Sequence, residues 1–180
     1  MALTKLNNNS LHAITDGSAL KNVTGTVLQV KQTVVTSVIS LATSTGAWHD
    51  VPSLSVSITP KSSNSDILVS VKCEVGSNAN GNLSMRLVRG STAIGIGDAV
   101  SSANRSSFSA ANRGTSASEA YGVSFQFLDS PSTTSATTYK VQHYNNWNTT
   151  QIYLGRPHNS LSTADDEAYP SIITVMEIAG

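Results

Sequence analysis

The residues with the clearest chemical potential lie in one polar stretch near the end of the chain, "RPHNSLSTADDEAYP". This stretch holds His158, Asp165, Asp166 and Glu167, and clustered carboxylates supply the oxygen ligands that Ca²⁺ prefers. Their spacing does not match the calcium loop of an EF-hand. We therefore interpret the stretch as a solvated acidic loop, with cation binding as the alternative.

A second stretch, "VQHYNNWNTTQIY", combines Tyr144, Trp147 and Tyr153 with amide side chains. Aromatic rings beside amides suit sugar recognition, because sugars offer apolar faces and hydroxyls, and aromatic residues are also enriched at protein interfaces. These three residues therefore have three alternative roles: glycan contact, a subunit or partner interface, or packing within a turn. Arg105 and Arg113, farther back in the chain, are candidates for contact with an anionic surface, or else are simply solvated.

The known catalytic and cofactor-binding motifs are incomplete or absent in this sequence. The Gly95-x-Gly97 pair in "AIGIGDA" lacks the third glycine and the helix pattern of a dinucleotide site, so it is typical of a turn or bulge. No Gly-x-Ser-x-Gly elbow is present, and His49 and His143 fall within strand patterns. We expect a protein that is not an enzyme and that uses no cofactor or metal.

The composition limits the class of protein further. In 180 residues, 11 Lys+Arg balance 11 Asp+Glu, which argues against a basic nucleic-acid-binding face. Cys73 is the single cysteine, so an intramolecular disulfide is excluded. Ser and Thr together make up 48 residues, which favours short strands joined by turns. No apolar stretch is long enough to span a membrane.

Apolar and polar residues alternate along several segments after residue 26, as they do in strands that bury one face. The clearest example is "DILVSVKCEVGS", and "YGVSFQFLDS" and "TTYKVQHYN" follow the same pattern. Roughly nine or ten such strands predict an all-β fold: an antiparallel β-sandwich of the jelly-roll type over residues 26–180. Residues 98–120 are small and polar, and we expect them to form a long loop.

The final stretch, "PSIITVMEIAG", is apolar on both faces of a predicted strand. One face carries Ile172, Met176 and Ile178, and the other carries Ile173 and Val175. In a sheet with one face in solvent, the strands carry polar side chains on that face. We therefore predict a central strand that lies between its own core and a neighbouring subunit, with a fully buried strand of a monomeric sandwich as the alternative.

Residues 1–25 differ from the rest, because scattered apolar residues occur there without a clear period. We interpret this segment as an N-terminal arm that becomes ordered against a partner, with a disordered tail as the alternative. The residues expected to dock are Leu3, Leu6, Leu11, Ile14 and Leu20.

Four stretches in this order resemble a group of virion proteins of tailed bacteriophages, especially phages of aquatic bacteria. They are "GTVLQVKQT", "RLVRGSTAIGIGDA", "FLDSPSTTSATTYKVQ" and "PSIITVMEIAG". The resemblance covers roughly residues 25–180, and the arm matches least. In that group a similar domain occurs at the tips of tail fibres or as a small separate structural protein.

The resemblance implies a jelly-roll domain similar to the trimeric C1q and tumour-necrosis-factor type, and a structural role in the virion. The partners it implies are the chain itself as a homotrimer, other virion proteins bound through the arm, and a host-surface glycan, with no nucleic acid or membrane. A fibre, spike or knob that contacts the host is the first expectation. A capsid decoration protein on the phage head and a carbohydrate-binding module are the alternatives.

Overall fold

A computed structural model gives the fold of the chain and describes residues 24–41, 46–77, 81–112, 119–145, 151–159 and 167–180. Every regular element in these ranges is a strand. The part described therefore contains no helix long and apolar enough to cross a membrane.

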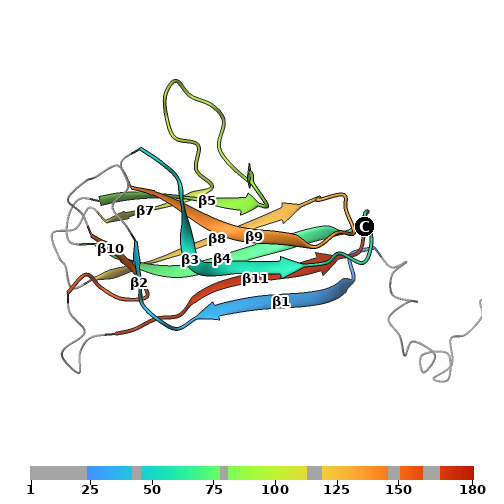
Figure 1. Cartoon of the computed structure of the whole chain (residues 1–180), viewed down its shortest axis with the longest axis horizontal. Coiled ribbons are helices and arrows are strands. Elements are labelled where there is room, and N and C mark those ends of the chain that lie inside the picture. The colour runs from blue at the N-terminus through green and yellow to red at the C-terminus, as the bar shows by residue number, and fades with distance from the viewer. Residues whose placement is uncertain (1–23, 42–45, 78–80, 113–118, 146–150, 160–166) are drawn as a thin grey trace, which may run out of the picture.

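The strands form two antiparallel sheets that run along the long axis of the molecule (Figure 1). Sheet A contains β1 (Val27–Val35), β2 (Ile39–Leu41), β4 (Asp66–Ser77), β8 (Ala120–Asp129), β10 (Ile152–Leu154) and β11 (Ser171–Ile178). Sheet B contains β3 (His49–Ile58), β5 (Gly81–Arg89), β6 (Thr92–Ile94), β7 (Phe108–Asn112) and β9 (Thr137–Asn145).

The chain wraps around the core by crossing repeatedly between the sheets. Across sheet A the long strands lie in the order β8–β4–β11–β1, while β10 and β2 continue the sheet beside the last residues of β4. Across sheet B the order is β3–β9–β5, with β7 and β6 on the far edge of β5. The long strands β3, β4, β5, β8, β9 and β11 alternate between the sheets, which is a jelly roll. The predicted all-β antiparallel sandwich is confirmed.

Alternation along β4 fills the core as the sequence predicts. Its buried side chains point between the sheets: Ile67, Val69, Val71, Cys73 and Val75. Burial raises the pKa of the Cys73 thiol to about 12, so this cysteine stays protonated and acts as a small core residue. The opposite side of the core is formed by buried side chains of sheet B: Leu54, Val56, Ile58, Leu83, Met85, Leu87, Tyr139 and Val141.

The last strand of the chain is central, as predicted. β11 pairs with β1 on one side and with β4 on the other. Ile173 and Val175 are completely buried in the core, whereas Ile172, Met176 and Ile178 are half-buried on the outer face of sheet A. Pairing on both sides holds this apolar segment in the sheet.

Two features differ from the sequence-based expectations. β7 lies inside the stretch expected to be a loop, because its backbone pairs with the free edge of β5 and Phe108 stacks on Phe125 with 5.3 Å between the ring centroids. The sequence also predicts two separate strands in "AWHDV" and "LSVSITP", whereas the structure places both segments in β3. An irregularity joins them where Ser53 adopts a φ of 61°.

Residues 95–107 form an excursion from sheet B, between β6 and β7, that rises away from the sandwich in Figure 1. Gly95 starts it with a φ of 58°, and a Cβ there would lie 2.8 Å from the Phe127 ring. Gly95 therefore forms a bend after β6, and the turn between β5 and β6 lies instead at Gly90 and Ser91.

Candidate functional surfaces

The outer face of sheet A carries a row of four apolar side chains, one from each long strand. Met176 of β11 is directly opposite Val30 of β1 and Leu68 of β4. Leu68 in turn is opposite Leu128 of β8. Residues paired across an antiparallel ladder point to the same face, so the four side chains form one continuous line. Val30 is 51% exposed and Leu128 is 54% exposed. We call these four residues the sheet A row.

A polar row lies next to the sheet A row. It consists of Gln32, Thr174, Ser70 and Gln126, which are paired across the same four strands. The Gln32 amide donates to Thr174 Oγ1 at 2.8 Å, and the Gln126 amide donates to Ser70 Oγ at 3.4 Å. This polar row separates the sheet A row from Val34 and Ile172, an apolar pair that lies beyond it on the same face.

The edge of sheet A beside this row is open. Among the described strands, β1 pairs only with β11, and it carries exposed valines at positions 27, 30 and 34. A long edge strand with exposed apolar residues readily pairs or packs with another chain. The open edge and the sheet A row together make one continuous surface suited to contact between subunits.

Both ends of the described chain lie at the same end of the sandwich. Gly25 N–H donates to Ala179 O at 2.7 Å, and Ala179 N–H donates to Thr26 O at 2.9 Å. Figure 1 shows the C-terminus and the start of β1 at the right-hand end. The predicted docking residues Leu3, Leu6, Leu11, Ile14 and Leu20 lie outside the described residues.

The aromatic residues singled out in the sequence do not form one cluster. Tyr144 lies on β9 in sheet B, Tyr153 lies on β10 in sheet A, and Trp147 lies outside the described residues. Tyr153 packs instead with Arg156, whose guanidinium carbon is 3.9 Å from the ring centroid, and with His158. Tyr144 and Tyr153 therefore lie on different sheets, and glycan contact, an interface and packing within a turn stay open as their roles.

Tyr144 instead belongs to a cluster on the outer face of sheet B. Its ring centroid is 5.5 Å from that of Trp48, and the Arg86 guanidinium carbon is 4.3 Å from the Trp48 centroid. Burial lowers the pKa of Arg86 from its ordinary value. Sequence reasoning missed Trp48 and Arg86, since they reach Tyr144 through the pairing of two other strands, β3 and β5, with β9.

The remaining polar candidates are tied to the protein itself or lie outside the description. Arg105 Nε donates to Gly97 O at 2.7 Å, which braces the excursion. Arg113, Asp165 and Asp166 lie outside the described residues. Glu167 accepts a hydrogen bond from Tyr169. Within the described ranges, no three metal-ligating side chains gather in one place.

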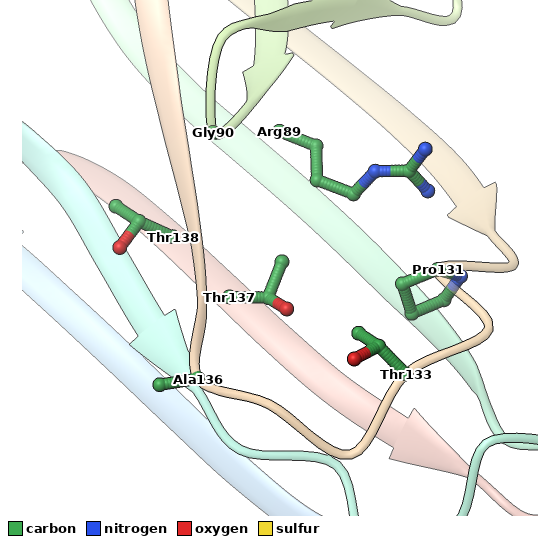
Figure 2. A pocket seen from close by; sticks show the side chains of 7 residues that line it. All are labelled: Arg89, Gly90, Pro131, Thr133, Ala136, Thr137 and Thr138. Atoms are coloured by element: carbon green, nitrogen blue, oxygen red, sulfur yellow. The ribbon is translucent and has the colours of Figure 1, made fainter.

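A hollow of about 350 Å³ opens beside the segment that joins β8 to β9 (Figure 2). It is lined by Arg89, Gly90, Pro131, Thr133, Ala136, Thr137 and Thr138. None of these seven residues is a carboxylate, histidine or cysteine, so the lining holds no acid–base pair.

The one charged group of this hollow is already paired. Arg89 Nη1 donates to both carboxylate oxygens of Asp129, at 2.8 and 2.9 Å, and Tyr139 Oη donates to Asp129 Oδ2 at 2.6 Å. Burial and the neighbouring carboxylate raise the pKa of Tyr139. Because Arg89 and Tyr139 belong to sheet B and Asp129 to sheet A, these three residues clamp the two sheets together.

His143 is a core residue. Its side chain points between the sheets, and its Nδ1 has no hydrogen-bond partner among the described residues. Burial, with a smaller contribution from nearby His49, lowers the pKa of His143 to about 4. The strand pattern predicts a structural histidine with satisfied hydrogen bonds. The buried position fits that prediction, whereas the unpartnered Nδ1 differs from it.

No protein-family model matches the chain, and comparison with curated proteins finds no match.

Proposed function

We propose that this protein is a non-enzymatic structural protein of a bacteriophage virion, and that three copies assemble through the outer face of sheet A. The observation that carries this proposal is the sheet A row beside the open edge of β1. Burial of Val30 and Leu128, each about half exposed, contributes roughly 1 kcal/mol per side chain. The two flanking apolar residues Ile172 and Ile178 enlarge the same face.

The position of the chain ends supports an orientation on the particle. The arm enters the sandwich beside the C-terminus, so a domain held by residues 1–23 directs its opposite end outward. In this arrangement the arm docks on a capsid, tail or adaptor protein, and the far end of the sandwich meets the solvent or the host. In this orientation the hollow lined by Arg89 lies at the end nearer the particle, because Asp129, the partner of Arg89, and Glu177 of β11 both pair with Ile67.

Two placements fit this orientation: a fibre, spike or knob on the tail, and a decoration protein on the head. Antibodies raised against residues 26–180 distinguish them in purified virions by immunogold electron microscopy. Gold at the tail supports the appendage, and gold spread over the head supports decoration. Mass spectrometry of gradient-purified virions that detects no copy of the chain would refute the virion role.

The assembly contact is tested with charge substitutions in the sheet A row. Met176→Asp and Leu128→Asp each place a carboxylate where the proposed interface is desolvated, and an unpaired buried charge is strongly unfavourable. Both side chains lie on the outer face of sheet A, so a lone subunit tolerates the change. We expect folded monomers by circular dichroism and light scattering.

Val100→Asp is the matched control for these two variants. Val100 is the most exposed of the large apolar residues described, at 67%, and it lies on the excursion from sheet B. This variant is expected to remain trimeric. Oligomers that persist in both row variants would show that another surface joins the subunits.

A further inference from the structure

A hydrogen-bonded network crosses three neighbouring strands on the outer face of sheet B. Lys140 Nζ and Gln142 Nε2 each donate to Asp50, at 2.7 Å in both cases. Gln142 Oε1 accepts from Arg86 Nε and Nη2, at 2.9 and 2.7 Å. Arg86 in turn lies over Trp48. The network therefore holds an arginine and an aromatic ring in fixed positions on an open sheet.

The charges of this network do not balance. The network holds two cations, Arg86 and Lys140, but only one carboxylate, Asp50. The two oxygens of that carboxylate accept from Lys140 and Gln142, so Arg86 has no carboxylate partner in the network. Among the described residues, Arg86 Nη1 has no hydrogen-bond partner. The face consequently offers a guanidinium donor and one excess positive charge beside the rings of Trp48 and Tyr144.

The same face lacks the features of a protein-binding patch. Among the described residues, none of the exposed large aliphatic side chains belongs to β3, β5 or β9. The outer positions of these strands include Ser55, Ser57, Ser84 and Thr138, which are small and polar. Protein interfaces have an apolar centre, whereas aromatic rings among hydroxyls and amides suit a ligand with apolar faces and many hydroxyls.

We propose that the outer face of sheet B binds a carboxylated carbohydrate. The C–H faces of the sugar rings pack on Trp48 and Tyr144, and a sugar carboxylate pairs with Arg86 and Lys140. Because Gln142 and Asp50 already fix these side chains, little conformational entropy is lost on binding. The proposal that this carbohydrate comes from a host surface rests on the proposed virion function, but the binding site itself does not.

The test is isothermal titration of the full chain with three probes: oligogalacturonate, oligosialic acid and a neutral galacto-oligosaccharide. We expect at least one acidic probe to bind at least tenfold more tightly than the neutral one. Comparison of the two acidic probes distinguishes a preference for a uronic acid from a preference for a sialic acid. Added salt should weaken only the acidic binding. Absence of binding by both acidic probes, or equal binding of all three, overturns the proposal.

Substitutions locate the site. Trp48→Ala should weaken binding of the acidic probe about tenfold. Arg86→Gln, which keeps most of the side-chain length, should reduce acidic binding to the neutral level. Tyr153→Ala is the matched control, because Tyr153 also has an arginine over its ring but lies in sheet A. Unchanged binding by folded Trp48→Ala, or an equal loss in Tyr153→Ala, contradicts the assignment.

These measurements are independent of the assembly proposal. Repeating the titration with the Leu128→Asp variant, whose substitution lies on the other sheet, separates the two. If the wild-type protein is a monomer but binds an acidic probe, the trimer proposal fails and the binding site stands. If the protein is a trimer that binds neither acidic probe, the binding site fails and the assembly proposal stands.

Discussion

The clamp formed by Asp129, Arg89 and Tyr139 gives a quantitative prediction for Asp129→Ala. The substitution removes three hydrogen bonds and leaves the fully buried Tyr139 hydroxyl without an acceptor. An unsatisfied buried hydroxyl costs about 1–3 kcal/mol. The Arg89 side chain is 30% exposed, so it rehydrates in part, and its lost ion pair adds only about 1 kcal/mol.

The expected loss in the free energy of unfolding is therefore about 3 kcal/mol for Asp129→Ala. Tyr139→Phe leaves the Arg89–Asp129 pair intact, and it should cost about 1–2 kcal/mol. The double variant removes both the donor and the acceptor, so it should be no less stable than Asp129→Ala alone. A stability cost of the double variant smaller than the sum of the two single costs shows that Tyr139 and Asp129 act through one shared contact.

Urea unfolding followed by tryptophan fluorescence measures these differences. All variants are compared at one protein concentration, because the stability of an oligomer depends on concentration. A cost below about 1 kcal/mol for Asp129→Ala, or additive costs in the double variant, would refute the clamp.

Three further predictions concern buried polar groups. The pKa of His143 is depressed from 6.5 to about 4 in the folded protein, so stability is complete above pH 6.5 and falls as the unfolded chain takes up a proton. Urea titrations should detect a loss of about 2 kcal/mol from this group between about pH 7 and about pH 5, and His143→Gln should flatten that slope. Glu177 is fully buried and accepts from Gln29 Nε2 and from the Lys61 backbone N–H, at 2.6 and 2.7 Å. Glu177→Gln turns one acceptor into a donor, so it should cost about 2 kcal/mol in the same assay, and an unchanged unfolding midpoint would argue against the buried contact. Cys73 should resist a thiol reagent in native protein and react at once in urea, whereas rapid native labelling would contradict its burial.

The fold is largely predictable because local alternation reports which face of each strand is buried. The pattern along β4 identifies its inward residues, and the apolar pattern of β11 identifies a central strand. β7 could not be predicted in this way, because its formation depends on pairing with β5 rather than on its own composition. Only Phe108 in that segment gives an apolar signal.

The candidate surfaces depend on register between distant segments, which a single sequence does not reveal. Gln142 contacts Asp50 and Arg86, which are 92 and 56 residues away along the chain. Tyr144 and Tyr153 are close in sequence yet lie on strands of different sheets. The sheet A row likewise combines β1, β4, β8 and β11, and its alignment follows from the pairing of these strands.

The most direct test of the assembly is the molar mass of the purified protein by light scattering. The full chain is compared with a version that lacks residues 1–23, which keeps the hydrogen bond between Gly25 and Ala179. We predict that both are trimers, because the sheet A row lies within the sandwich and not in the arm. A monomeric full-length chain would contradict this account and would leave the outer face of sheet A without its proposed partner.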